Sequence, residues 1–194
     1  MGTLYVMMGK SASGKDTIYH RVMSMCPELK KVIPYTTRPI RAGEEDGREY
    51  IFSNIKELGH LRSAGKVVEC REYQTVHGTW YYFTVDDGAI DLEIYDYLMI
   101  STLEGYEKIR DYYGEQRVQP IYIAVNDFER MERSLKRERQ QENPCVAEVC
   151  RRFLADEQDF SREKLARAGV FEEIENDNLE DCICRVLKRL DKSR

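Results

Sequence analysis

A glycine-rich segment near the amino terminus constrains the fold of this chain more than any other feature. Residues 9–17 read Gly-Lys-Ser-Ala-Ser-Gly-Lys-Asp-Thr, a G-x4-G-K pattern. An apolar run at 4–8 precedes the segment, and apolar residues at helical spacing follow it, beginning with Ile18 and Val22. Glycines let backbone N–H groups turn inward around an anion, and a helix amino terminus adds partial positive charge. The pattern predicts a strand, a phosphate loop over 9–17 and a helix.

The phosphate loop carries side chains suited to a nucleotide. Lys15 can reach the β- and γ-phosphates, while a nearby hydroxyl can hold Mg²⁺. Asp16 stands where this pattern usually has Ser or Thr, so Thr17 is the better metal-binding hydroxyl. The alternative is a plain glycine turn with a surface lysine. The expected contacts of the donor ATP in this loop are Gly9, Ser11, Ala12, Ser13, Gly14, Lys15, Asp16 and Thr17.

A second segment, over residues 35–50, is rich in Arg and Tyr. Arg38 and Arg41 are three apart around a proline, so their guanidinium groups can converge on one phosphate, and Tyr50 can add a donor. Further on, Glu69 ends an apolar strand, where a carboxylate can accept from the N–H groups of a base edge. The alternative is that both arginines form surface salt bridges with nearby acids, namely Glu44, Glu45 or Asp46.

Strand-like and helix-like segments alternate along the rest of the chain, which predicts a mostly parallel sheet covered on both faces. Residues 34–88 and 127–152 interrupt the alternation, the second with a break at Asn143-Pro144. The expected strands are 66–69, 81–85, 97–102 and 120–125, and the expected helices are 104–113 and a final one from Leu179 to Leu190.

The order of these motifs resembles the guanylate kinase family. The glycine-rich loop, a T-T-R-x-x-R-x-G-E-x-x-G-x-x-Y run over 36–50 and a glutamate about twenty residues further on follow the order of that family. The resemblance covers nearly the whole chain and implies a three-layer α/β/α P-loop fold. It divides one domain into a core at 1–33, 85–126 and 158–194, a nucleotide monophosphate-binding subdomain at 34–84 and a lid at 127–157.

The resemblance also implies an acceptor site. Arg38, Arg41 and Tyr50 would clamp the phosphate of the acceptor, and Glu69 would contact its base. A later Tyr-Gly-Ser/Thr element of the family is matched loosely by His77-Gly78-Thr79, which adds Thr79 to the acceptor contacts. The missing phenol would come from Tyr81 or Tyr82.

Arginines of the lid would stabilise the transferring charge. Arg137, Arg151 and Arg152 match the family best, whereas Arg133 is a weaker candidate and Arg139 is expected to be solvated. Near the carboxyl terminus, Asn176 would lie close to the adenine of ATP by the same resemblance. Taken alone, it reads as part of a helix-capping turn.

Part of the base-reading set of the family is absent. The acidic D-I-D-x-Q-G element aligns with residues 100–105, where Ile100 and Thr102 replace both aspartates. Pro34 stands where the family often has a serine before the T-T-R run. The sequence therefore keeps the phosphate-gripping residues and loses residues that serve guanine.

The charge balance excludes some functions. Thirty Lys and Arg against 35 Asp and Glu give a net charge of −5, which argues against broad nucleic-acid binding but allows a local basic pocket. No apolar run approaches the roughly 20 residues that span a bilayer.

Six scattered cysteines without a CxxC pair are expected to be reduced and mostly buried, with no zinc site. We expect a cytoplasmic monomer or homodimer that binds small-molecule nucleotides, not nucleic acid or membrane.

These features together predict transfer of the γ-phosphoryl group from Mg·ATP to GMP or a related nucleoside monophosphate, with Mg²⁺ as cofactor. Two alternatives stay open. The acceptor can be another phosphorylated metabolite, because a phosphate clamp does not name what carries the phosphate. The chain can also be a catalytically weak guanylate-kinase-like binding module, although the Gly14-Lys15 cradle argues against it.

Overall fold

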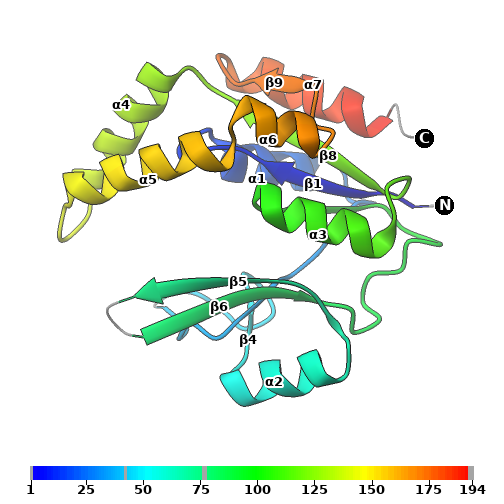
Figure 1. Cartoon of the computed structure of the whole chain (residues 1–194). Coiled ribbons are helices and arrows are strands. Elements are labelled where there is room, and N and C mark those ends of the chain that lie inside the picture. Colours follow the sequence, from blue (N-terminus) through cyan, green and yellow to red (C-terminus); the bar gives the residue numbers. More distant parts are fainter. Residues whose placement is uncertain (1, 42, 76–77, 192–194) are drawn as a thin grey trace.

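The computed structural model describes residues 2–41, 43–75 and 78–191, in which strands and helices alternate (Figure 1). The strands are β1 (Leu4–Met8), β2 (Lys30–Lys31), β3 (Tyr35–Thr36), β4 (Ile51–Phe52), β5 (Val67–Thr75), β6 (Gly78–Val85), β7 (Tyr97–Ile100), β8 (Val118–Ala124) and β9 (Glu173–Glu175). The helices are α1 (Lys15–Met25), α2 (Ile55–Ser63), α3 (Leu103–Tyr113), α4 (Asp127–Glu138), α5 (Val146–Asp159), α6 (Arg162–Arg167) and α7 (Leu179–Asp191).

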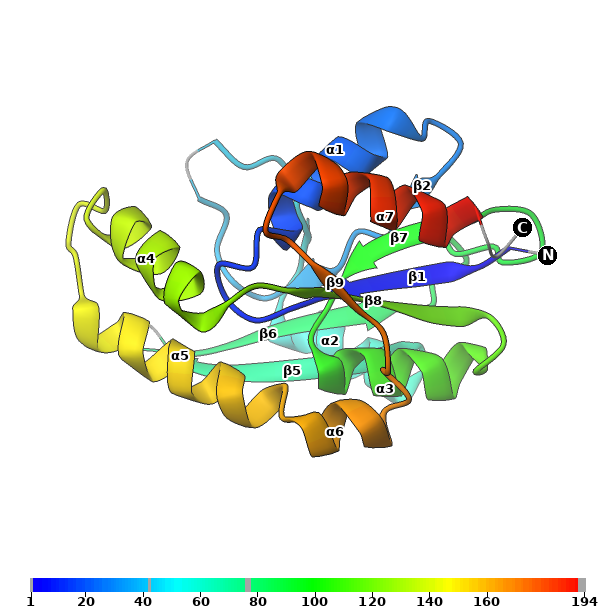
Figure 2. The ribbon, with the colours of Figure 1, turned by 90° about the horizontal axis from the view of Figure 1, so that it is seen from above.

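The central sheet is parallel, in the order β2-β7-β1-β8-β9. Its middle strand β1 is buried on both faces, because successive side chains of a strand point in opposite directions. Leu4 and Val6 pack in one cluster with residues of α3 and α6, while Tyr5 and Met7 pack in another with α1 and α7. Figure 2 shows these helix pairs on opposite sides of the sheet. The expected three-layer α/β/α fold is confirmed.

A smaller sheet, in the order β4-β3-β6-β5, lies within residues 34–85 and is built on the antiparallel hairpin of β5 and β6. One face of this sheet packs on α2, where Leu58 meets Phe83 and Val85. In Figure 1 the smaller sheet lies beneath α3, and strand β5 of this sheet contacts α3.

Helices α4 and α5 lie side by side and extend away from the core (Figure 2). The first ends at Glu138 and the second begins at Val146, so the predicted break at Asn143-Pro144 lies in the connection between them. No helix in the described ranges is both long and apolar enough to cross a membrane.

Three details of the sequence analysis need correction. Strand β7 ends at Ile100, not at 102, because the Thr102 side chain accepts a hydrogen bond from the Gly105 amide and so caps α3. The hairpin strands are longer than 66–69 and 81–85, since polar residues of β5 and β6 continue the pairing to Thr75 and Gly78. The six cysteines carry thiols rather than disulfides, but they are not mostly buried: Cys182 is buried, Cys26 and Cys70 are half-buried, and Cys145, Cys150 and Cys184 are exposed.

A pair of isoleucines tests the packing of the core. Ile109 of α3 is completely buried, whereas Ile94, in the connection before β7, is 66% exposed. We expect Ile109→Ala to lower the free energy of unfolding by about 2–5 kcal/mol, because it removes buried methyl groups and leaves a cavity. The matched control Ile94→Ala should change it by less than about 0.5 kcal/mol. Equal losses in urea unfolding of the two variants would contradict this core.

Candidate active site

The phosphate loop is packed so tightly that two of its glycines have no room for a side chain. A Cβ atom on Gly9 would lie 2.5 Å from the Ile123 carbonyl oxygen, and one on Gly14 would lie 2.5 Å from the Asn176 side-chain nitrogen. Gly14 also has a φ of +85°, and Ala12 a φ of +62°, in the left-handed region that favours glycine. Both glycines of the motif are therefore required by the local structure.

The loop leads directly into the amino terminus of α1. Gly14 is its N-cap and no side chain caps the first turn, so the amide groups there are open to an anion. Lys15 is half-buried, with its Nζ atom 3.9 Å from the Asp16 carboxylate, while Asp16 and Thr17 are exposed on the same turn. One cation, one carboxylate and one hydroxyl thus surround the start of α1.

Asn176 holds the phosphate loop in place. Its side chain is buried and donates to the Ser13 carbonyl at 2.8 Å, while its backbone amide donates to the Ala124 carbonyl at the end of β8. Ser13 is also buried, and its Oγ atom has no hydrogen-bond partner among the described residues. The cap of α7 is Asn178, which accepts from the Glu180 and Asp181 amides, so Asn176 contacts the loop and does not cap the helix.

Arg38 is almost completely buried, with only 3% of its surface exposed. Its Nη1 and Nη2 atoms donate to both oxygens of Glu44 at 3.0 and 2.8 Å, and its Nε atom donates to the Tyr82 hydroxyl at 3.1 Å. The guanidinium also lies over the ring of Tyr50. Hydrogen bonding to Glu44 raises the pKa of Arg38, and the same contact lowers the pKa of Glu44. A carboxylate thus occupies the arginine fork proposed for a phosphate.

Arg41 is placed differently from Arg38. Its backbone amide donates to Glu44 at 2.8 Å, but its exposed side chain lines a cavity of about 560 Å³. Arg137 of α4 and Arg152 of α5 line the same cavity. Arg38 and Arg41 therefore share Glu44, and of these two only Arg41 lines the cavity beside α4 and α5.

Glu69 lies on β5, facing away from α2, and its carboxylate is fully buried. Arg71 donates to it through Nε at 3.1 Å and through Nη2 at 3.3 Å, and the Thr84 hydroxyl donates at 2.9 Å. Tyr82 lies on the same face of the hairpin, with its ring 5.5 Å from those of Tyr50 and Tyr73.

Two other predicted acceptor residues lie away from this group. Tyr81 packs on the α2 side of the sheet, where Arg62 stacks on its ring, so Tyr82 and not Tyr81 is the phenol that meets Arg38. Thr79 donates to the Gln74 side chain on the neighbouring strand. His77 lies outside the described residues.

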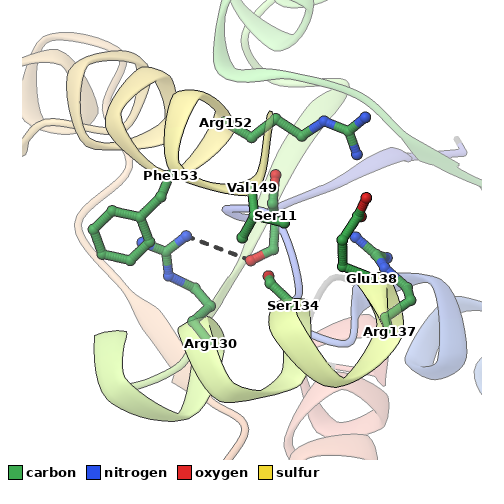
Figure 3. Close-up of a pocket in the computed structure, with 8 residues that line it drawn as sticks. All are labelled: Ser11, Arg130, Ser134, Arg137, Glu138, Val149, Arg152 and Phe153. Atoms are coloured by element: carbon green, nitrogen blue, oxygen red, sulfur yellow. Dashed lines mark hydrogen bonds between the residues drawn. The ribbon is translucent and has the colours of Figure 1, made fainter. Parts of the chain in front are cut away.

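Helices α4 and α5, which lie in the predicted lid, bring two of the three predicted catalytic arginines together. Figure 3 shows Ser11 of the phosphate loop between side chains of α4 and α5, in a small pocket that Arg137 and Arg152 also line. Arg151 is exposed and donates twice to Glu148, at 2.7 and 2.8 Å, and this pairing helps lower the pKa of Glu148 to about 2. Arg152 also donates to Glu148, at 2.7 Å, so one carboxylate orients both arginines.

The remaining lid arginines have separate positions. Arg133 donates to Glu129 at 2.9 Å and to the Asn176 carbonyl at 3.3 Å, next to the phosphate loop. Arg139 is exposed at the end of α4, as expected for a solvated residue.

Arg130 of α4 is a residue that the sequence analysis missed. It is 2% exposed and donates to Asp127 at 3.0 Å, to Asp156 at 3.1 Å and to Glu157 at 2.8 Å, with its guanidinium 4.3 Å from the centre of the Phe153 ring. Arg130 and Asp156 also bind the phosphate loop directly, through the Ser11 carbonyl at 3.4 Å and the Ser11 amide at 2.8 Å. Lys10 adds a bond to Glu157 at 2.5 Å.

We call this group the lid latch. It joins α4 and α5 to the phosphate loop and consists of Arg130, Asp156, Glu157 and Lys10. In the sequence, Arg130 is one arginine in a run of many charged residues, and the Asp156-Glu157 pair lies one helix later. Sequence spacing does not show that these groups meet, because the loop between α4 and α5 sets their register.

The three positions that depart from the family pattern have structural roles of their own. The Pro34 carbonyl accepts from the Ile51 amide at 3.0 Å, and Ile100 packs in the core cluster beneath α1 and α7. The Thr102 hydroxyl caps α3. None of these three residues has a carboxylate, unlike the aspartates of the family pattern at two of the positions.

The chain is similar in sequence to known proteins. The chain matches the family described as "Guanylate kinase" over residues 1–193. It is 31% identical over 156 residues to the guanylate kinase of Bordetella pertussis, an alignment that covers 79% of this chain and 68% of that protein. A shorter match, 38% identical over 80 residues, covers 41% of this chain and 38% of the guanylate kinase of Aromatoleum aromaticum.

A solved structure supports the fold across the whole chain. The crystal structure of guanylate kinase from Anaplasma phagocytophilum superimposes with a TM-score of 0.64 at 21% identity, covering 98% of this chain and 85% of the other. Family match, sequence relatives and fold lead to the same conclusion as the motifs: the chain belongs to the guanylate kinase family, whose members are ATP-dependent nucleoside monophosphate kinases.

Proposed function

We propose that this protein transfers the γ-phosphoryl group of Mg·ATP to GMP or a related nucleoside monophosphate. The observation that carries the proposal is the cavity lined by Arg41, Arg137 and Arg152, between the acceptor segment and the lid. Arg137 and Arg152 also border the pocket that contains Ser11 of the phosphate loop. Phosphoryl transfer needs positive charge where a donor and an acceptor phosphate meet, and these three arginines would supply it in a cavity that Glu138 and Glu142 also line.

The donor would bind at the start of α1. Lys15 and the open amides of the first helical turn would hold its β- and γ-phosphates. Mg²⁺ prefers oxygen ligands and is usually bound by one or two carboxylates together with phosphate oxygens and water. The exposed Asp16 carboxylate and Thr17 hydroxyl form a donor set that fits this ion. Bound there with ATP, Mg²⁺ would neutralise charge that develops on the phosphates.

The acceptor would bind on the other side of the cavity. Its phosphate has the geometry to replace the Glu44 carboxylate on the Arg38 fork, with Arg41 reaching the same phosphate from the cavity side. An acceptor oxygen then attacks the γ-phosphorus, the bond to the bridging β,γ-oxygen breaks, and ADP leaves. Positioning and charge carry this step, so no general base is needed.

A coupled assay of ADP release with Mg·ATP tests the activity. The acceptor panel is GMP, dGMP, AMP, UMP, CMP, ribose 5-phosphate and inorganic phosphate. Turnover with a nucleoside monophosphate supports the proposal. Turnover with ribose 5-phosphate alone would assign the protein to another phosphorylated metabolite, and no turnover with any acceptor would favour a binding module.

Lys15→Met should abolish the reaction without unfolding the protein. The side chain is the main cation of the phosphate loop, and loss of one such group typically lowers kcat by about a hundredfold or more. Steady-state kinetics and circular dichroism make the measurement, with Lys56→Met on the exposed face of α2 as the control. Retained turnover in the Lys15 variant would remove the loop from the mechanism.

Arg41→Ala should raise KM for the acceptor by about tenfold or more and leave KM for ATP within about twofold, because its guanidinium faces the acceptor side of the cavity. Its exposed position makes the variant safe for folding. Arg48→Ala is the matched control, since Arg48 pairs with Glu45 and Glu49. An equal rise in both KM values would be inconsistent with the assigned role.

Arg130→Met should lower kcat by about tenfold or more, because the lid loses its attachment to the phosphate loop and three acids lose their shared cation. The free energy of unfolding should fall by about 1–3 kcal/mol. Arg139→Met, at the exposed end of the same helix, should change neither value. Unaltered kcat in the Arg130 variant would show that the lid latch has no part in catalysis.

A further inference from the structure

The face of the β5–β6 hairpin opposite α2 carries one continuous row of side chains. Cross-strand partners lie on the same face of a sheet, as do residues two apart on one strand. Glu69 pairs with Thr84, Arg71 with Tyr82, and Tyr73 with Trp80. Tyr82 connects this row to the phosphate clamp, because its hydroxyl accepts a hydrogen bond from Arg38. Arg71 therefore lies beside the acceptor cleft, one residue pair away from Glu69.

Glu69 supplies the carboxylate in this row of side chains, and this carboxylate is not accessible to a ligand. Its side chain is fully buried, and three hydrogen bonds from Arg71 and Thr84 engage both of its oxygens. A base edge would have to displace these bonds to donate to Glu69. Arg71, the partner of Glu69, is 17% exposed and can still donate hydrogen bonds to a ligand.

The guanidinium of Arg71 is used on one edge only. Nε and Nη2 point to Glu69, and the described residues offer no hydrogen bond to Nη1. The second edge, formed by Nη1 and Nη2, therefore keeps two parallel N–H donors. Burial acts to lower the pKa of Arg71, but the charge of Glu69 and the nearby Tyr73 and Tyr50 hydroxyls outweigh it and raise the pKa, so the group stays cationic. Glu69 thus acts as a support that fixes the plane of the arginine.

Aromatic rings enclose the same place. Tyr50 and Tyr73 both lie 5.5 Å, centre to centre, from the ring of Tyr82, each at a steep angle. Faces of this kind stack on a nucleobase whatever its identity. The tyrosines can hold a base, and the edge of Arg71 is the feature that can distinguish one base from another.

We propose, on the basis of the function proposed above, that Arg71 selects the acceptor by reading a base edge with two adjacent hydrogen-bond acceptors. Two nucleobases present such an edge to an arginine: a 6-oxopurine through O6 and N7, and cytosine through O2 and N3. Adenine places its amino donor beside N7, and uracil places N3–H between its two carbonyl oxygens, so neither fits. The 2-amino group of guanine lies away from the O6 and N7 edge, and IMP should therefore bind as well as GMP.

Calorimetric titration of the full chain with GMP, IMP, CMP, AMP and UMP tests this proposal without requiring turnover, so a failed kinase assay does not decide it. We expect GMP and IMP to bind within about threefold of each other and at least tenfold more tightly than AMP and UMP. Preference for CMP would support the same reading and identify cytosine as its source. Preference for AMP or UMP, or GMP tighter than IMP by tenfold or more, would overturn it.

Arg71→Lys separates base reading from folding, because lysine keeps the cation beside Glu69 and loses the planar second edge. The affinity for the preferred nucleotide should fall by on the order of tenfold to a hundredfold, while that for ribose 5-phosphate stays within about twofold. Arg62→Lys, on α2 and stacked on Tyr81 at the opposite face of the hairpin, is the matched control. Unchanged nucleotide affinity in the Arg71 variant, or equal loss for ribose 5-phosphate, would contradict the assignment.

Discussion

The close approach of the phosphate loop to β8 and to the turn before α7 is the constraint on which the rest of the site depends. Gly9 lies against the Ile123 carbonyl, and Gly14 lies against Asn176, whose side chain in turn binds the Ser13 carbonyl. The loop can take this path because β1 is buried at the centre of a parallel sheet and ends at the same edge as β8. Lys15 and the first turn of α1 are placed by this packing.

Ion pairs with carboxylates hold the arginines of the candidate site in place. Glu148 orients Arg151 and Arg152, and Glu69 fixes Arg71. In each pair a carboxylate keeps a long cationic side chain in one geometry, which lowers the entropy that a ligand must remove on binding. The net charge of −5 is therefore compatible with several arginines at the site, since acids support these arginines by ion pairs.

Sequence patterns predicted the layers of the fold because apolar periodicity reports directly which faces are buried, as in β1 and α7. They also located the phosphate loop, whose spacing is fixed by its backbone. Patterns did not show that Glu69 is covered by Arg71, that Tyr82 faces the cleft, or that Arg130 binds three acids. Each of those depends on strand register or on the angle between two helices, and tertiary packing sets both.

In the proposed reaction a phosphoryl group moves directly between two bound phosphates. Phosphorus-31 NMR of the protein with Mg·ATP and GMP follows that movement most directly. We predict loss of the ATP γ-resonance, with ADP and GDP appearing in equal amounts and no inorganic phosphate. Appearance of ADP with inorganic phosphate and unchanged GMP would show transfer to water, and would contradict the account.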